Sequence, residues 1–324
     1  MNQRIKAVDH IINNCAFATH SDRITVVYDL HTLEIAKLFG ERLKELNFPN
    51  INLVEEKYRE MHGIEPSNET AEIMKQSNLI FGLTSSSMAH TKARLTACNS
   101  GARYLSMPEY SWNLLESSAI MTNYEDRSPI VKKIADLFTN GKKIKITSEL
   151  GTDLTMQIDD RIGNYCPGFV KVRGDLGSPP DIEANVSPIE DKTDGLLIID
   201  GSIPCPEIGL LDSPVKLKVS KGKVVDIFGE KKEIISILKN IFEKVGSDKA
   251  YVIAECGIGL NELAKLTGVM LTDEGANGHI HIGIGSNSTV GGKNSVNFHL
   301  DFVMTSASLK IDDLLVVDKG VIVV

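Results

Sequence analysis

The chain lacks several features that mark whole classes of protein. Its 324 residues carry a formal net charge of −8, from 35 Lys and Arg against 43 Asp and Glu. Phosphate binding needs clustered cations, so we do not expect nucleic acid as a main partner. No stretch approaches the ~20 apolar residues that cross a bilayer, and the N-terminal segment has no signal-peptide core. We therefore expect a cytoplasmic protein with no membrane partner.

Two familiar binding motifs are missing as well. The five cysteines are scattered and odd in number, without a CxxC pair, so we expect reduced and mostly buried thiols, Cys256 among them. The glycine-rich stretch GIGSNSTVGG lacks both the G-x-G-x-x-G spacing and a following helix. A nucleotide site at this stretch is therefore not expected.

Residues 1–140 alternate buried-strand patterns with helical periodicity. Strands are predicted at 23–30, 50–55, 78–83 and 102–108, and helices at 32–48, 68–76 and 88–101. Strands that alternate with helices of this length are typical of a parallel, doubly wound sheet. The chain is long enough for two domains, and we predict an α/β Rossmann-like domain over 1–140.

Residues 141–324 have a different character, with short strands bounded by glycine turns. One helix is predicted at 231–246, and the segment 259–268 (GLNELAKLTG) is a second helix candidate. The fold class is therefore α/β, with a doubly wound N-terminal domain and a β-rich α+β C-terminal domain.

The stretch NFHLDF (297–302) places a histidine and an aspartate among large apolar residues. In a strand, residues two apart project from the same face, so His299 and Asp301 share a face opposite the apolar side chains. The stretch HIHIGIG repeats the pattern with His279 and His281. Such a pair on its own is usually a surface feature without function.

Carboxylates accompany these histidines in the sequence. Glu255 follows a predicted strand, and Glu274 lies in the turn TDEGANG just before His279. Imidazole and carboxylate groups that converge at one end of a sheet are typical ligands of divalent cations. The two paired patterns together favour a metal site in the C-terminal domain.

The segment from AECGIGLNELAKLTG through TDEGANGHIHIGIG to NFHLDF resembles the C-terminal signature of the aminopeptidase T/aminopeptidase S metallopeptidase family. It equally resembles that family's relatives, which include an iron-dependent dihydroxypyridine dioxygenase. GTDL (151–154), PPDIEANVSP (179–188) and TSSSMAHTKAR (84–94) are similar to upstream parts of these proteins. The resemblance covers most of the chain and implies a homodimer.

The resemblance implies which residues hold metal. They are Glu183, Glu255, His281, His299 and Asp301. In the aminopeptidases such a set holds one or two divalent ions, of Zn, Co or Mn, that activate water against a small peptide. The first hypothesis is therefore a metal-dependent aminopeptidase that removes N-terminal residues from small peptides.

One position departs from the peptidase pattern. Ser288 stands where the aminopeptidases place a catalytic tyrosine, and the loss of one such donor typically costs 10²–10³ in rate. The second hypothesis is therefore an iron-dependent ring-cleaving dioxygenase. In it His281, His299 and Asp301 form a two-histidine, one-carboxylate Fe(II) site. A third hypothesis is a relative that binds without catalysing.

Other positions carry two interpretations each. Glu274 is either a general acid/base that supports a metal ligand or a plain turn carboxylate, and His279 is either a stray ligand or a sheet-face residue. The helix that follows TSSS offers an anion site at its N-terminus. Its candidate substrate-binding residues are Ser85, Ser86, His90, Thr91 and Arg94, and the alternative is simple capping by Ser87.

Overall fold

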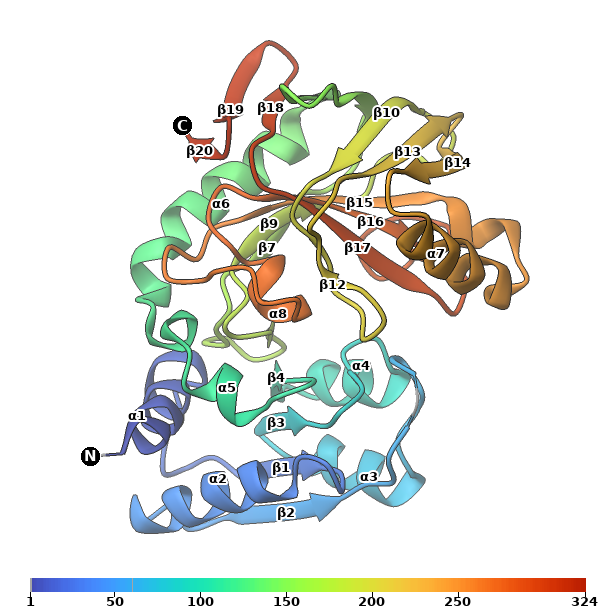
Figure 1. Cartoon of the computed structure of the whole chain (residues 1–324). Coiled ribbons are helices and arrows are strands. Elements are labelled where there is room, and N and C mark those ends of the chain that lie inside the picture. The colour runs from blue at the N-terminus through green and yellow to red at the C-terminus, as the bar shows by residue number, and fades with distance from the viewer. Residues whose placement is uncertain (1, 60) are drawn as a thin grey trace. The chain divides into compact units, whose positions relative to one another are not determined.

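The structure is a computed structural model that describes residues 2–59 and 61–324. It divides into two compact units, and each is described by itself (Figure 1). Unit 1 comprises Met1–Asp126 and Cys166–Pro180, and unit 2 comprises Arg127–Tyr165 and Asp181–Val324. A boundary at 140/141 was expected from the sequence. The two units do not follow this single boundary, because the chain crosses between them three times, after residues 126, 165 and 180.

Unit 1 contains a five-stranded parallel sheet in the order β2-β1-β3-β4-β8. Its strands are β1 (Ile24–Tyr28), β2 (Ile51–Glu55), β3 (Leu79–Leu83), β4 (Arg103–Ser106) and β8 (Leu176–Gly177). The first four confirm the predicted strands. β8 comes from a distant segment and pairs with β4, which explains why residues 166–180 belong to this unit.

Helices connect the strands of unit 1, as the doubly wound pattern predicts. α2 (Leu33–Glu45), α3 (Asn68–Gln76) and α4 (Lys92–Asn99) connect β1 to β4 in turn. The other helices of the unit are α1 (Gln3–His10) and the π-helix η1 (Ile11–Cys15) before β1, and α5 (Trp112–Leu115) and the 3-10 helix η2 (Ser118–Met121) after β4. Every residue of β3 is buried, as expected of a strand inside a parallel sheet covered by helices. α4 begins later than predicted, and its N-cap is Thr91 rather than Ser87.

Unit 2 is β-rich and has two sheets. The eight-stranded sheet has the order β14-β13-β10-β6-β5-β18-β19-β20, and the seven-stranded sheet has the order β12-β11-β17-β16-β15-β9-β7. The strands of the first are β5 (Lys143–Thr147), β6 (Asp153–Gln157), β10 (Thr193–Ile199), β13 (Val215–Ser220), β14 (Lys223–Gly229), β18 (Ser308–Ile311), β19 (Leu314–Asp318) and β20 (Val321–Ile322). Those of the second are β7 (Asn164–Cys166), β9 (Glu183–Val186), β11 (Ser202–Ile203), β12 (Gly209–Leu210), β15 (Ile253–Gly259), β16 (Ile280–Gly285) and β17 (His299–Met304).

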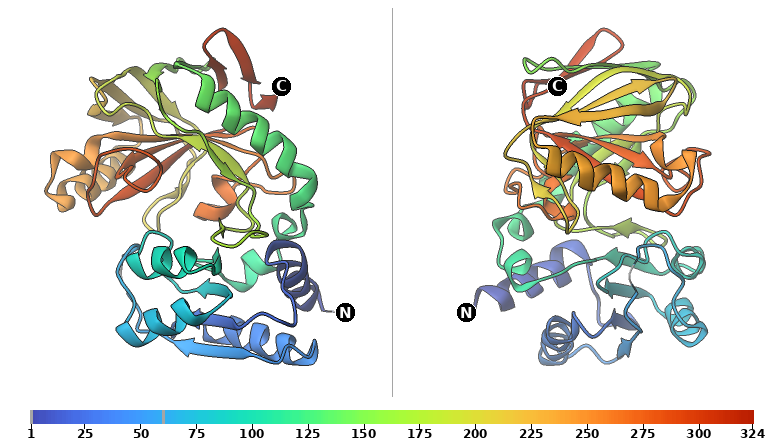
Figure 2. Two further views of the ribbon diagram at one scale, coloured as in Figure 1. Left: turned by 180° about the vertical axis from the view of Figure 1, so that it is seen from behind. Right: turned by 45° about the vertical axis from the view of Figure 1, so that its right-hand side comes forward.

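The helices of unit 2 are few. α6 (Tyr124–Asn140) contains the boundary between the units, and it is followed by α7 (Lys232–Val245), the 3-10 helix η3 (Asp248–Tyr251) and α8 (Met270–Asp273). α7 confirms the predicted helix and packs beside β14, as two further views also show (Figure 2). The mixed α/β class with one parallel sheet and large antiparallel sheets is thus confirmed.

The second predicted helix, at 259–268, is wrong. Gly259 is the last residue of β15, and Asn261 forms a β-bridge with Ala276. The backbone N–H of Asn261 donates to Gly275 O at 2.8 Å, so the segment begins as an extended, paired strand end. The helix of this region is α8, which starts at Met270.

Cys15, Cys98, Cys205 and Cys256 are free thiols, and Cys15, Cys98 and Cys256 are buried. Burial raises the pKa of the Cys256 thiol far above its ordinary value. Within the part of the chain that the structure describes, no helix is long and apolar enough to cross a membrane.

Candidate metal centre

The seven-stranded sheet of unit 2 has one apolar face and one polar face. Cross-strand pairing aligns Ile282 with both Cys256 and Phe302, and these side chains form the apolar face. Phe302 stacks on Phe242 of α7, with ring centroids 6.5 Å apart. Because side chains alternate along a strand, the neighbouring residues must point to the other side of the sheet.

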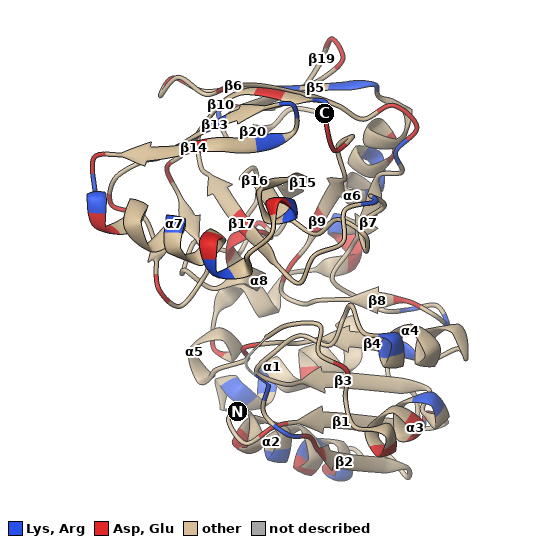
Figure 3. Ribbon diagram, turned by 90° about the vertical axis from the view of Figure 1, so that its right-hand side faces the viewer, with Lys and Arg blue, Asp and Glu red and all other residues tan. Residues whose placement is uncertain are grey.

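The polar face brings together all five residues that the resemblance implies as metal ligands. In the register of the sheet, Glu255 and Asp301 both pair with Gly283, and Gly257 pairs with both His281 and Asn185. Two donor clusters result, Glu183 with Glu255 and His281, and Glu255 with His299 and Asp301. The atoms of each cluster lie within 4.8 Å of one another. Figure 3 marks acidic residues in red, including the one on β17.

Glu255 is common to both clusters. One of its carboxylate oxygens lies 4.0 Å from His281 Nε2, and the other lies 3.4 Å from His299 Nε2. His299 Nε2 is also 3.3 Å from Asp301 Oδ1, and His281 Nε2 is 2.9 Å from Glu183 Oε2. The two imidazoles therefore lie on either side of the Glu255 carboxylate, each with a second carboxylate of its own.

Two glycines make room for the imidazole rings. A Cβ on Gly257 would lie 2.0 Å from His281 Nε2, and a Cβ on Gly283 would lie 2.6 Å from His299 Nε2. Glycine inside a strand often marks a place where a ligand or another group comes close to the backbone. The sheet is thus shaped to hold both rings over its polar face.

Burial and charge act together on the acidic groups. Burial raises the pKa of Glu255, and the nearby Glu183 charge adds to this effect. For Asp301, burial alone would raise the pKa. The charge of His299 and its hydrogen bond, together with the charge of His281 and a hydrogen bond from Glu274, outweigh burial and lower the pKa to about 2. Burial, and then the charge of Asp301, raises the pKa of the half-buried Glu274 well above its ordinary range.

The two imidazoles are shifted in the opposite sense. Burial alone would lower the pKa of His281. The charges of Glu183 and Asp301 and the hydrogen bonds to Glu183 and Glu255 together outweigh burial and raise it well above its ordinary value. Burial would likewise lower the pKa of His299, and Asp301 raises it to about 10. In the absence of a cation, protons on both rings balance part of the negative charge.

The cluster carries more carboxyl groups than imidazoles. Five carboxyl groups face two rings, namely Asp181, Glu183, Glu255, Glu274 and Asp301. A buried carboxylate is costly unless it is paired, hydrogen-bonded or bound to a metal. Asp181 Oδ1 and Glu274 Oε1 are buried atoms without a hydrogen-bond partner. The donor set and its unpaired oxygens therefore fit a divalent cation.

Hydrogen bonds from outside the cluster orient the donors. His299 Nδ1 lies 2.8 Å from Ser286 O, which leaves Nε2 as the nitrogen that faces the carboxylates. A backbone carbonyl on the far ring nitrogen commonly fixes the tautomer of a metal-binding histidine. The side chain of His299 is 32% exposed to solvent, so the cluster is open to solvent on this side.

Sequence reasoning missed some members of this centre. Asp181 is 6% exposed, and its pKa is raised first by burial and then by the charge of Glu183. The signal was present, because Asp181 and Glu183 are two residues apart, as His299 and Asp301 are. Asn185, which donates to Glu183 Oε1 at 2.7 Å, was missed as well.

Two further candidates lie near the centre but outside both donor clusters. His279 precedes β16. Burial lowers its pKa, although the charges of Asp200 and Asp273 act to raise it. Glu274 follows α8 and shares a hydrogen bond with Asp301. Because its pKa is raised, Glu274 is the partner that carries the proton and donates it. Ser288 is exposed in the loop between β16 and β17.

The candidate substrate-binding residues lie in unit 1, around the N-terminus of α4. Ser85 donates to Asp29 through its backbone N–H at 2.6 Å and its hydroxyl at 2.9 Å. Arg94 Nε donates to Ala89 O. His90 is exposed, and Ser86 Oγ donates to Arg59 O at 2.6 Å.

The N-terminus of α4, where an external anion was expected, holds a carboxylate of the same chain. Glu65 accepts from the backbone N–H groups of Lys92 at 2.6 Å and Ala93 at 3.0 Å. An anion from outside would have to displace Glu65. Substrate binding by Ser85, His90 and Arg94 stays a prediction.

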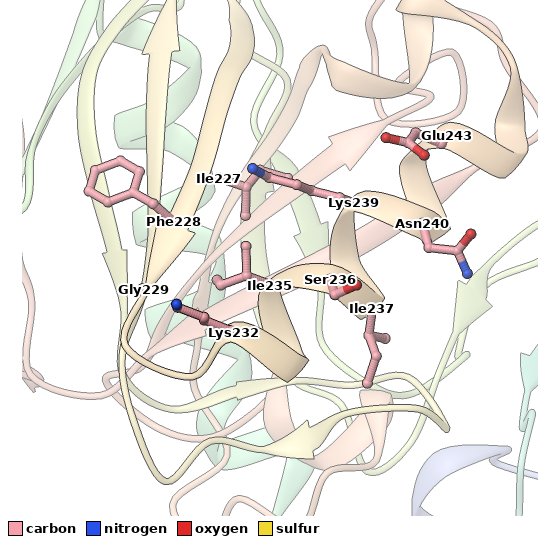
Figure 4. A pocket seen from close by; sticks show the side chains of 10 residues that line it. All are labelled: Ile227, Phe228, Gly229, Lys232, Ile235, Ser236, Ile237, Lys239, Asn240 and Glu243. Atoms are coloured by element: carbon pink, nitrogen blue, oxygen red, sulfur yellow. The ribbon is translucent and has the colours of Figure 1, made fainter.

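A surface pocket of about 720 Å³ lies between β14 and α7, away from the donor clusters (Figure 4). Its walls include Phe228, Lys232 and Lys239, and Glu243 is its single acidic residue. This lining offers no set of metal ligands. The chemistry of unit 2 therefore centres on the polar face of the seven-stranded sheet.

Comparisons with known proteins agree with this picture. The structure is similar to 2,5-dihydroxypyridine dioxygenase from Pseudomonas putida KT2440, with a TM-score of 0.86 and 17% identity over 100% of this chain and 98% of that chain. It is also similar to wild-type AmpT from Thermus thermophilus, with a TM-score of 0.74 and 13% identity over 99% of each chain. At these identities the two likenesses establish the fold.

A search of curated protein sequences found no match. The sequence model of the NicX family, described as 2,5-dihydroxypyridine 5,6-dioxygenase, matches residues 15–324. That match covers nearly the whole chain, and the resemblance seen in the sequence included this branch. The chain therefore belongs to the NicX dihydroxypyridine dioxygenase family.

Proposed function

We propose that this protein is an iron-dependent oxygenase that opens a dihydroxylated aromatic or N-heterocyclic ring. The observation that carries the proposal is the family match over residues 15–324, combined with imidazole and carboxylate donors on one sheet face. This departs from the aminopeptidase hypothesis favoured by the sequence. The dihydroxypyridine dioxygenase is also the more similar of the two solved structures, with a TM-score of 0.86 against 0.74.

His281, His299 and Asp301 would hold the ferrous ion in this proposal. Two histidines and one carboxylate are the donor set of many non-haem iron oxygenases, which keep open positions for oxygen and substrate. When bound, the ion supplies those positions and the redox chemistry. Gly257 and Gly283 leave the space in which the two rings turn their Nε2 atoms to the same face.

The remaining carboxyl groups would handle protons. A hydroxylated ring must lose a hydroxyl proton before it becomes electron-rich enough to react with oxygen. Glu255, whose carboxylate lies between the two imidazoles, is placed to take that proton. Glu274, protonated and hydrogen-bonded to Asp301, is placed to return one to the product.

A second candidate is hydrolysis of small peptides by two cations. The observation that favours it is that Glu255 belongs to both donor clusters, as a bridging carboxylate would. Glu183 and His281 would then hold one ion, and His299 and Asp301 the other. Against it stands Ser288, which offers no phenol to stabilise a tetrahedral oxyanion.

One experiment separates the two candidates. The protein is stripped of metal, loaded anaerobically with Fe(II), and mixed with 2,5-dihydroxypyridine in an oxygen electrode. The ring-cleaving proposal expects one iron per chain and oxygen uptake that stops when the substrate is consumed. Cleavage of aminoacyl p-nitroanilides by Zn- or Co-loaded protein, with two ions per chain and no oxygen uptake, would overturn it.

The same preparation tests the non-catalytic hypothesis. If the protein retains no metal and its melting temperature is unaffected by a chelator, neither enzyme candidate stands. The family would then include a member that kept the fold without the cation. Metal retention with either activity removes that hypothesis.

A further inference from the structure

A chain of two asparagine side chains ends on Glu183. Asn185 Nδ2 donates to Glu183 Oε1 at 2.7 Å, and Asn164 Nδ2 donates to Asn185 Oδ1 at 2.7 Å. Asn185 follows Glu183 by two residues on β9, points to the same face and is 3% exposed. Asn164 is on the edge strand β7, next to β9. Neither residue belongs to a donor cluster.

The direction of this chain depends on Asn164. An asparagine amide has a donor and an acceptor of nearly equal shape, so its neighbours decide which end points where. Because Asn164 Nδ2 is a donor, the Asn185 amide turns its Oδ1 toward Asn164. The Nδ2 of Asn185 then faces Glu183. Asn164 Nδ2 also donates to Val290 O at 3.1 Å, which holds it from the loop between β16 and β17.

The effect on Glu183 is asymmetric. Its Oε1 accepts from Asn185, whereas its Oε2 lies 2.9 Å from His281 Nε2, with which it forms an ion pair. We infer that Asn185, oriented by Asn164, is a positioning residue that holds Glu183 with its second oxygen turned toward His281 and the cation. The inference rests on the proposed function: Glu183 would hold an ion in the two-ion arrangement, and with one ion it would orient the His281 ring, whose Nε2 lies 2.9 Å from its Oε2.

The first test removes the donor. Partners that hydrogen-bond to metal ligands typically contribute 10–100-fold in metal affinity. Asn185→Leu keeps a similar shape without the amide, and we expect it to weaken Mn(II) binding by about that factor. Binding is followed by loss of the electron paramagnetic resonance signal of free Mn(II), with no substrate present. An unchanged affinity would overturn the inference.

The second test uses the sign of the effect. Asn164→Asp places a carboxylate opposite Asn185 Oδ1, so the Asn185 amide should turn over and present its oxygen to Glu183. Charge alone would make an added carboxylate tighten the binding of a nearby cation. We expect weaker Mn(II) binding instead. Equal or tighter binding would show that the amide does not position Glu183. Asn164 is only half-buried, so this variant should fold even if the Asn185 variant does not.

A matched control and the wild type separate this inference from the proposed function. Asn78→Asp changes a half-buried asparagine of unit 1, whose Oδ1 accepts from Arg23 N at 3.1 Å, and should leave the Mn(II) affinity unchanged. Thermal melting without metal checks the fold of each variant. If the wild type binds neither Mn(II) nor Fe(II), the proposed function and this inference fail together. If it binds and the two asparagine variants bind equally well, only this inference fails.

Discussion

The ring of His281 occupies the space directly over Gly257, its partner across the β15–β16 pair. An added Cβ at Gly257 would lie 2.0 Å from Nε2 and 2.2 Å from Cε1 of that ring, well inside van der Waals contact. The position of the imidazole therefore depends on the absence of a side chain on the neighbouring strand.

Gly257→Ala should displace the His281 ring and lower metal affinity by at least tenfold. Overpacking of this kind typically costs about 1–3 kcal/mol of folding free energy. Metal content after dialysis and the melting temperature measure the two effects. Gly229→Ala is the control. Gly229 is the last residue of β14, and the atom nearest to a Cβ added there would be Pro214 O, at 3.1 Å. Full metal retention by Gly257→Ala would contradict the role of His281.

His299→Ala should abolish metal retention, because it removes a nitrogen that lies 3.4 Å from Glu255 and 3.3 Å from Asp301. The loss of metal affinity should exceed the ~10–100-fold loss that follows when a residue hydrogen-bonded to a metal ligand is removed. His279→Ala, outside both donor clusters, serves as the control and should keep its metal. The assignment of ligands is wrong if both variants retain metal equally.

Metal binding should release protons and strengthen as the pH rises. In the metal-free protein, burial alone would lower the pKa of His299, but Asp301, Glu255 and the Ser286 carbonyl together raise it to about 10. The ring is therefore protonated at neutral pH. A cation must displace that proton, so affinity should rise about tenfold per pH unit below that value. Mn(II) titrations between about pH 6 and 9 measure the slope. An affinity independent of pH would show that no donor carries a proton.

The same raised pKa has a consequence for the metal-free fold. A group whose pKa is higher in the folded state stabilises that state most below its unfolded value, 6.5 for histidine. The contribution of His299 should therefore be complete in mild acid and disappear as the pH rises toward about 10. Denaturant unfolding of the metal-free protein across this range tests the direction, with His299→Ala as the reference.

Glu56 should stabilise unit 1 at neutral pH. Burial alone would raise its pKa, but hydrogen bonds from Thr70, Ser67 and Lys57 outweigh burial and lower it to about 2. Glu56→Gln should cost about 1.5–3 kcal/mol at pH 7, the usual contribution of hydrogen bonds to a charged group. Because the folded-state pKa is lowered, this cost is present above about pH 4.5 and disappears as the pH falls toward 2.

Urea unfolding at several pH values measures the Glu56 effect. Glu55→Gln is the control, since Glu55 is the exposed last residue of β2, directly before Glu56, and should change stability little. A cost for Glu56→Gln that stays constant down to pH 3 would contradict the electrostatic explanation.

Local patterns predicted much of the fold because they report short-range geometry. The alternation in NFHLDF predicted that His299 and Asp301 share a face, and the register of β17 agrees. The parallel sheet of unit 1 followed from strands that alternate with helices. The helix expected at 259–268 failed because long-range pairing of Asn261 with Ala276 competes with local helical periodicity.

The candidate metal-binding residues could be named from the sequence, but their mutual arrangement could not. Period-two alternation determines which side of its own strand a residue occupies, so the sequence alone determined that each strand carries its polar groups on one side. Only the tertiary structure decided that four strands align those sides, with Glu255 between the two imidazoles and Asn185 against Glu183. The register between strands is a long-range property, set by packing of the apolar face and by loops that no local pattern encodes.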